Sequence, residues 1–190
     1  MLKQISSKEY VSDDGQYRII SFGSRWELVK KGFATYEAIG SFDECKKKYI
    51  ELSSGRISWN DIYINIAKIV AKRSKDPHTK VGCVIVKNNQ IVSMSYNGEP
   101  RDFNKEFDWS SNEKYDYIVH AEMNAFINAS KLGVSCENAD VYVTLSPCKT
   151  CMLMLSQIHV KNIYFVDKYN DFDESKKIAE SAGIKLVQLK

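Results

Sequence analysis

The spacing of apolar residues changes along this chain, and each spacing predicts a different element. Over Trp59–Arg73, isoleucine and valine recur every three or four positions, which is typical of an amphipathic helix. Val81–Val86 and Ile91–Tyr96 are short apolar runs rich in β-branched residues, and such runs favour strands. The residues between them, Lys87–Gln90, predict a hairpin turn.

The alternation of strands and helices continues towards the end of the chain. Three further helices are expected at His120–Lys131, Cys148–Gln157 and Asp173–Ala182. Three strands alternate with them, at Val141–Leu145, Asn162–Val166 and Lys185–Leu189. Such an order predicts a sheet covered by helices on both faces, with right-handed crossovers between parallel strands. The polar, aromatic stretch Gly98–Asp116 has no clear period, and its length for a loop suggests a functional role.

A different pattern comes before the polar break at Ser53–Arg56. Gln16–Gly23 and Arg25–Lys31 favour two strands around a turn, and Phe33–Gly40 is a possible third strand. This part of the chain therefore begins as a small antiparallel unit, separate from the alternating region.

A helix over Phe42–Leu52 completes the first part of the chain. Ser41 can serve as its N-cap, and Glu44 stands three residues later, where it can complete a capping box. We therefore expect a small N-terminal β-β-(β)-α module over residues 1–56 and a second domain over residues 57–190. The module is small for independent stability, so we expect it to pack on something, as an oligomer or docking module.

Composition and charge fit a globular protein in a reducing compartment. The 190 residues include 27 basic and 24 acidic ones, and a net charge of +3 does not by itself imply nucleic acid. No apolar run reaches the roughly eighteen residues of a membrane span, and the polar start is not a signal peptide. An odd five cysteines fit a cytoplasmic protein better than a disulfide scaffold.

Candidate chemistry is concentrated in two short motifs, each at the expected start of a helix. His120 begins one motif, and in the other Cys148 and Cys151 are three residues apart, so both sulfurs face the same side of a helical turn. A helix N-terminus lowers thiol pKa values and so favours the thiolates that zinc requires. One imidazole and two thiolates can hold one zinc ion per chain and leave its fourth position open to water.

A closed structural zinc site is the alternative, and it needs a fourth protein ligand. The remaining soft ligands stand at no convincing spacing for one: His78, His159, Cys45, Cys83 and Cys136. Glu122 follows the histidine by two residues, and we expect it to move the proton of the water. Its structural alternative is a carboxylate that pairs with the helix dipole.

Longer segments around these motifs resemble one known family. The pairing of His-x-Glu with Pro-Cys-x-x-Cys is the signature of zinc deaminases, in which the glutamate acts as acid and base. From Trp59 to Leu189 the chain resembles the deoxycytidylate (dCMP) deaminases of the cytidine deaminase superfamily. The segments that carry the resemblance are Arg73–Pro77, Lys80–Gly82, Tyr96–Pro100, His120–Ala125, Tyr142–Cys148 with Cys151, and Asp167–Tyr169.

The resemblance implies a fold and an activity. The fold is a three-layer α/β/α sandwich around a five-stranded mixed sheet, usually in a hexameric assembly. The activity is zinc-dependent hydrolysis of dCMP to dUMP and ammonia, which supplies dUMP for thymidylate synthesis. Glu122 would be the catalytic residue, and the family's occasional second zinc site lacks its His/Cys set here.

Substrate contacts follow from the same resemblance. Asn97 would hydrogen-bond the sugar or base, Tyr169 would stack beside the pyrimidine, and Ser146 would orient the base through its backbone carbonyl. Each residue also has a structural interpretation. An Asn-Gly turn would explain Asn97, ordinary packing would explain Tyr169, and a helix cap would explain Ser146.

A monophosphate needs hydrogen-bond donors, and the closest group in sequence is Arg73, Ser74, Lys75 and Lys80. The two lysines are equally typical of solvated surface charges. In regulated family members, the loop after the Asn-Gly pair contributes to a nucleotide effector site. Binding of dCTP there activates the enzyme, and binding of dTTP inhibits it. Asp102 stands where that loop often has a second glycine, so regulation is left open by the sequence.

Two rival functions remain open. The N-terminal module weakly resembles three-strand-plus-helix modules of the AP2 type, some of which bind DNA. A polynucleotide cytosine or adenine deaminase, targeted by this module to single-stranded DNA or RNA, is therefore one rival. The ten basic and eight acidic residues of Met1–Arg56 argue against it. A catalytically silent zinc protein is the other, and the intact Glu122 argues against that.

Overall fold

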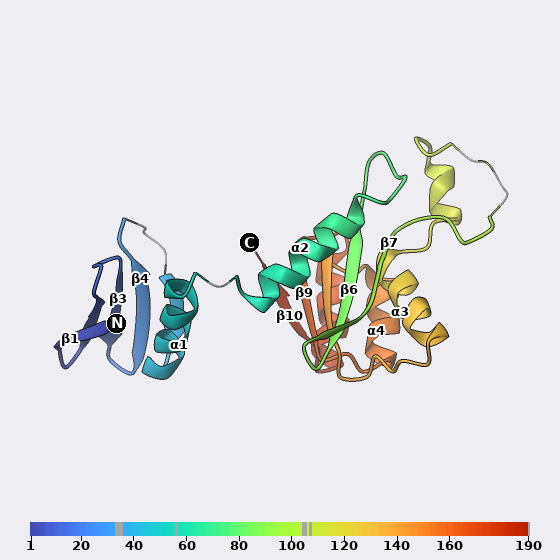
Figure 1. Ribbon diagram of the computed structural model, residues 1–190. Coiled ribbons are helices and arrows are strands. Elements are labelled where there is room, and N and C mark those ends of the chain that lie inside the picture. The colour runs from blue at the N-terminus through green and yellow to red at the C-terminus, as the bar shows by residue number, and fades with distance from the viewer. Residues whose placement is uncertain (33–35, 56, 104–105, 107, 190) are drawn as a thin grey trace. The chain divides into compact units, whose positions relative to one another are not determined.

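The computed structural model describes residues 1–32, 36–55, 57–103, 106 and 108–189 (Figure 1). The chain forms two compact units, Met1–Ser58 and Trp59–Lys190, so the division falls two residues beyond the expected boundary. Within the described ranges, no helix is both long and apolar enough to cross a membrane.

The N-terminal unit is an antiparallel sheet with one helix. Its strands pair in chain order, and they are β1 (Leu2–Ser6), β2 (Glu9–Ser12), β3 (Tyr17–Phe22), β4 (Arg25–Lys30) and β5 (Tyr36–Gly40). Helix α1 (Phe42–Ser53) contacts β3, β4 and β5. The expected β-β-(β)-α order is therefore incomplete, because β1 and β2 precede it. Residues 33–35 of the possible third strand lie outside the described residues.

The first strand gives little sequence signal because it buries no side chain. Leu2 is half-buried and the other residues of β1 are exposed, so the strand lacks the alternation that marks a half-buried one. The helix, in contrast, begins as expected. The Ser41 hydroxyl accepts from the amide of Glu44 at 3.2 Å, and the Glu44 carboxylate accepts from the amide of Ser41 at 2.7 Å. This is the reciprocal capping box.

The larger unit contains a five-stranded mixed sheet. Its elements are α2 (Trp59–Ala71), β6 (Gly82–Lys87), β7 (Gln90–Tyr96), the short 3-10 helix η1 (Asn112–Asp116), α3 (Ala121–Lys131), β8 (Asp140–Leu145), α4 (Lys149–Gln157), β9 (Asn162–Asp167), α5 (Phe172–Ser181) and β10 (Lys185–Gln188). The strand order is β10-β9-β8-β6-β7. Strand β6 is antiparallel to both neighbours, and β8, β9 and β10 are parallel. The expected mixed sheet is confirmed.

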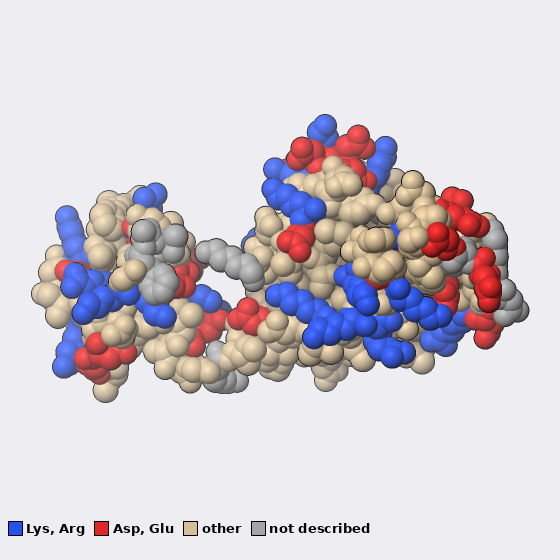
Figure 2. Space-filling model, turned by 90° about the horizontal axis from the view of Figure 1, so that it is seen from above, with Lys and Arg blue, Asp and Glu red and all other residues tan. Residues whose placement is uncertain are grey.

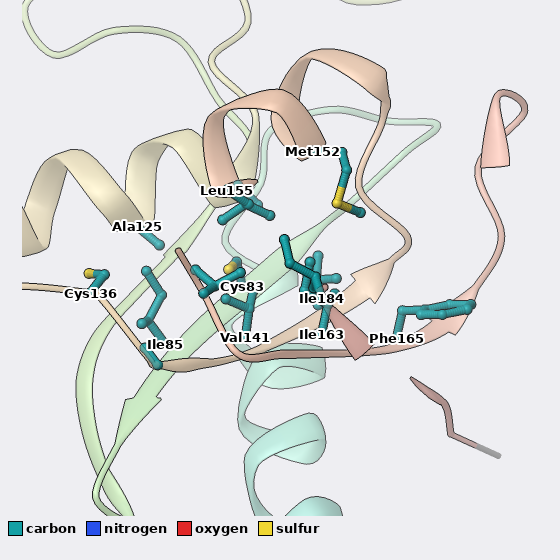
Figure 3. Packing of buried hydrophobic residues seen from close by; sticks show 14 of the residues in the cluster. Cys83, Ile85, Ala125, Cys136, Val141, Met152, Leu155, Ile163, Phe165 and Ile184 are labelled. Atoms are coloured by element: carbon teal, nitrogen blue, oxygen red, sulfur yellow. The ribbon is translucent and has the colours of Figure 1, made fainter. Parts of the chain in front are cut away.

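Helices cover the two faces of this sheet, which gives the expected three layers (Figure 1). Along β6, Val84 and Val86 pack with residues of α2, while Cys83 and Ile85 pack with residues of α3 and α4 on the other face. Figure 3 shows Ile85 beneath Ala125 of α3 in the larger of these clusters. A strand buried on both faces reads as a continuous apolar run, which is how β6 appears in the sequence.

Helix α2 lies unusually close to the sheet at Gly82. A Cβ atom at this position would overlap the carbonyl oxygen of Ala67 in α2, so only glycine fits without a backbone shift. At the other end of β6, Asn88 and Asn89 form the hairpin turn with φ of 52° and 59°. Asparagine tolerates this left-handed conformation better than most residues do.

Candidate metal centre and active site

Three ligating side chains meet where two helices begin. His120 is the N-cap residue of α3, Cys148 is the N-cap residue of α4, and Cys151 lies in the first turn of α4. The Nδ1 atom of His120 is 3.5 Å from the Cys148 sulfur and 3.4 Å from the Cys151 sulfur. The ligand atoms all lie within 4.8 Å of one another.

These distances fit a tetrahedral zinc ion. Zinc–sulfur bonds of about 2.3 Å and zinc–nitrogen bonds of about 2.0–2.1 Å separate tetrahedral nitrogen and sulfur ligands by about 3.5 Å. Over the described residues, no fourth histidine, cysteine or carboxylate joins the cluster. The set therefore matches a catalytic zinc site, with three protein ligands and one position for water, and not a closed structural site.

The surroundings favour the thiolate form of Cys148. Hydrogen bonds from the Cys151 thiol and from the His120 ring lower the pKa of Cys148 to about 4. The position of Cys148 at the helix N-cap adds the dipole and free amides of α4 to this effect. A thiolate is the form of cysteine that binds zinc.

Glu122 stands in the first turn of α3 and is 4% exposed. Burial raises the pKa of its carboxyl to about 7. A group with a pKa near neutrality can both accept and return a proton, as general acid–base chemistry requires. The carboxylate lines the same cavity as His120 and Cys148, so it can reach a molecule bound beside the metal ligands.

This cavity has a volume of about 320 Å³ and contains the three residues expected to contact the base or sugar of the substrate. Asn97, Ser146 and Tyr169 line it together with His120 and Glu122. A volume of this order lies at the lower end of the range for small-molecule sites. The structure thus brings these three residues to the metal cluster from three separate segments of the chain.

Asn97 is held in place by two hydrogen bonds. Its Oδ1 atom accepts from the amide of Val81 at 2.8 Å, and its Nδ2 group donates to the carbonyl of Thr79 at 2.9 Å. Its φ angle is not positive, so it does not occupy the left-handed turn that an Asn-Gly pair often forms. Because an amide nitrogen carries two hydrogens, one of them remains for a ligand in the cavity.

Ser146 and Tyr169 are joined to each other. The Ser146 hydroxyl accepts from the amide of Tyr169 at 2.8 Å, and the amide of Ser146 donates to the carbonyl of Asp167 at 2.8 Å. The N-cap of α4 is Cys148, so Ser146 is not the cap of that helix. These bonds tie the end of β8 to the segment after β9, and they set Tyr169 at the cavity.

The four residues considered for phosphate binding are separated in the structure. Arg73 and Lys75 line a second cavity of about 550 Å³, and Lys75 forms an ion pair with Glu99. Ser74 is buried, and its hydroxyl accepts from a backbone amide at 3.2 Å. Lys80 is exposed and lines neither cavity.

Several lining residues were not identified by the sequence analysis. They are Asp76, Thr79, Val81, Tyr115, Ile118, Ala121, Leu145, Lys168 and Asn170. Lys168 lies inside the Asp-Lys-Tyr segment already recognised, and its ammonium group is 4.8 Å from the ring centre of Phe172. Asp76 forms a buried ion pair with Lys114, and no pattern in the aperiodic stretch pointed to that lysine.

Known proteins are similar to this chain in sequence and in fold. The model of the cytidine and deoxycytidylate deaminase zinc-binding region matches residues 57–167. A probable deoxycytidylate deaminase of Caenorhabditis elegans is 41% identical over 151 residues, which are 75% of each chain. The human deoxycytidylate deaminase is 34% identical over 142 residues, 69% of this chain and 75% of the relative.

A solved structure agrees with these sequence matches. The dCMP deaminase of cyanophage S-TIM5, in complex with dCMP and dUMP, superposes with a TM-score of 0.62 at 27% identity. The similarity covers 67% of this chain and 94% of the cyanophage chain.

Replacing one ligand should remove the metal. In His120→Asn, zinc should fall from about one ion per chain to a small fraction, because two thiolates alone hold it poorly. The matched control is His159→Asn, since that histidine is exposed and lies outside the cluster. Elemental analysis of both purified variants measures the difference. Equal zinc contents would contradict the assigned ligand set.

Proposed function

The chain belongs to the family of zinc-binding cytidine and deoxycytidylate deaminases, and from that premise we propose that it converts dCMP and water into dUMP and ammonia. A relative named probable deoxycytidylate deaminase, 41% identical, and one named deoxycytidylate deaminase, 34% identical, support this substrate. The observation that carries the proposal is the burial of Glu122 in one cavity with the His120 and Cys148 ligands. Water activation and proton transfer can therefore take place at one point.

We propose that Glu122 acts as the proton shuttle. His120, Cys148 and Cys151 would hold a zinc ion, and this ion would supply the Lewis acidity that makes a water molecule nucleophilic near neutral pH. Glu122 takes a proton from this water and delivers it to ring N3, which makes C4 electrophilic. Oxygen bonds to C4, Glu122 transfers the second proton to the amino group, and the C4–N bond breaks to release ammonia. The remaining C4 oxygen becomes the carbonyl of dUMP.

The other lining residues are proposed to bind and orient the substrate. Tyr169 would stack on the pyrimidine, a contact that contributes about 1–3 kcal/mol per base in comparable sites. Asn97 would donate its remaining amide hydrogen to the sugar or base, and the carbonyl of Ser146 would accept from the base. We assign the phosphate to Lys168. Among the described residues that line the cavity, it is the one lysine or arginine.

Glu122→Gln tests the shuttle. The amide cannot carry a proton between water and substrate, so turnover of dCMP should fall by about 10²- to 10⁴-fold while zinc stays near one ion per chain. Glu137→Gln, on the surface, is the matched control. Ammonia release is measured with dCMP, dCTP, cytidine and single-stranded DNA. Full activity of Glu122→Gln would refute its role, and a preference for DNA would favour the polynucleotide rival.

We propose that the second cavity binds a nucleotide effector. Arg73, Lys75 and Arg101 provide cations there, and Trp109 contributes an aromatic surface. Asp102 has φ of 59°, the conformation that glycine adopts most readily. The loop thus keeps a glycine-like backbone although the glycine is replaced, which supports a retained site.

Effector titrations test this proposal. With dCMP below saturation, dCTP should raise and dTTP should lower the rate of ammonia release. Arg101→Ala should weaken both responses about tenfold, because a charge-assisted hydrogen bond to phosphate is lost. A rate that does not change with either nucleotide would contradict the proposed effector site.

We propose that the N-terminal unit is an oligomerisation or docking module and that the deaminase is a homo-oligomer, of the hexameric size that the resemblance implies. The unit has a core of its own around Ile19 and Leu28. Phe22 and Ile39 are both 53% exposed. Basic and acidic side chains are interspersed on the visible surface of the unit, which is less suited to a nucleic acid than to a protein partner (Figure 2).

Deleting residues 1–54 should change assembly more than chemistry. The elution volume in size-exclusion chromatography with light scattering should indicate a smaller assembly, while the kcat for dCMP stays within about twofold because the metal cluster lies in the larger unit. Phe22→Ser in the full-length chain tests the exposed surface without a deletion. An unchanged oligomer in both variants would count against an assembly role.

A further inference from the structure

The wall of the catalytic cavity contains a buried ion pair that the proposed chemistry does not use. Asp76 lines the cavity, and the ammonium group of Lys114 donates to its Oδ1 atom at 2.8 Å. Both side chains are 2% exposed. Lysine and aspartate are rarely buried so completely, and a buried pair of this kind often adds little net stability. The pair therefore calls for a functional explanation.

The charge of Asp76 is fixed by its surroundings. Its Oδ1 atom also accepts from the amides of His78 at 2.9 Å and Thr79 at 3.1 Å. Burial by itself would raise the pKa of Asp76, but the hydrogen bonds from Lys114 and from these amides hold it below its usual value. Asp76 is thus ionised at neutral pH, and the ammonium of Lys114 is the charge that neutralises it.

Lys114 acts on the cavity through other residues. It is not among the residues that line the cavity, so it does not contact a bound molecule directly. Its backbone carbonyl accepts from the amide of Ile118 at 3.0 Å, and Ile118 is part of the lining. The turn that carries Thr79 is held by Asp76 itself, through its bonds to the amides of His78 and Thr79, and these bonds do not require the lysine.

Binding of a nucleoside monophosphate requires that the charge of Asp76 be neutralised. Its phosphate carries between one and two negative charges near pH 7. An unpaired carboxylate in the wall would repel this anion, because charges near a protein surface interact more strongly than charges in bulk water. A nucleoside has no phosphate and would experience little of this repulsion.

We infer that Lys114 is a positioning and specificity residue, which cancels the charge of Asp76 so that the cavity accepts an anionic nucleotide. The inference rests on the proposed function, since it concerns the substrate class of the same site. It predicts that the pair affects the phosphate of the substrate and leaves the chemistry at the base unaffected.

The test compares dCMP with deoxycytidine in full-length variants. In Lys114→Met, KM for dCMP should rise about 10- to 100-fold, while kcat for dCMP and KM for deoxycytidine change less than about threefold. This rise corresponds to about 1.4–2.8 kcal/mol at 1.4 kcal/mol per tenfold. Lys131→Met, at the exposed end of α3, is the matched control. It should leave both substrates unaffected.

A second substitution separates charge from structure. The amide oxygen of an asparagine can still accept from the two backbone amides that Asp76 binds, so the double variant Lys114→Met with Asp76→Asn should recover most of the affinity for dCMP. Asp76→Asn alone leaves the lysine uncompensated and should shift the preference in the opposite direction, towards dCMP. This arm keeps the test decisive if Lys114→Met does not fold, which a thermal melt of each variant would show.

Several outcomes would overturn the inference. They are equal KM increases for the two substrates in Lys114→Met, no recovery in the double variant, and no shift in Asp76→Asn. If deoxycytidine reacts too slowly, inhibition constants for dUMP and deoxyuridine give the same comparison. A wild-type protein without activity on dCMP would refute the proposed function itself, whereas an active protein with an unshifted preference would refute only this inference.

Discussion

Two helix N-termini must converge on one point for this site to exist. The carbonyls of His120 and Cys148 accept the first helical hydrogen bonds of α3 and α4, at 2.9 Å and 2.8 Å. Each metal ligand is therefore built into the start of a helix, where amides without intrahelical partners favour a thiolate. Ala121 and Ala125 of α3 are fully buried, and their small side chains let this helix lie close to the sheet. The packing of the core thus sets the position of the metal.

Local chemistry made the metal cluster predictable. His120, Cys148 and Cys151 could be identified because zinc requires particular ligand types, and because a spacing of three residues places two sulfurs on one face of a helix. The strands of the larger unit were equally clear, since the double burial of β6 leaves an uninterrupted apolar run. In both cases the signal lies within a few neighbouring residues.

Contacts between distant segments were not predictable in the same way. Lys114 and Asp76 are 38 residues apart, and a lysine in a polar stretch normally indicates a solvated surface. Proximity in sequence did not place the four candidate phosphate ligands together either. Arg73 and Lys75 flank a buried serine and line the second cavity, so a run of donors in the sequence did not form one binding surface.

The close contact between α2 and β6 has a consequence for how this enzyme can vary. Gly82 leaves no clearance to the backbone of Ala67, and the residue before it, Val81, holds Asn97 through its amide. A larger side chain at this glycine would force the strand away from the helix and carry that amide with it. A change in the packing of α2 against β6, outside the cavity, would then alter the selectivity of the site. Changes in substrate range can therefore arise from packing as well as from the binding residues themselves.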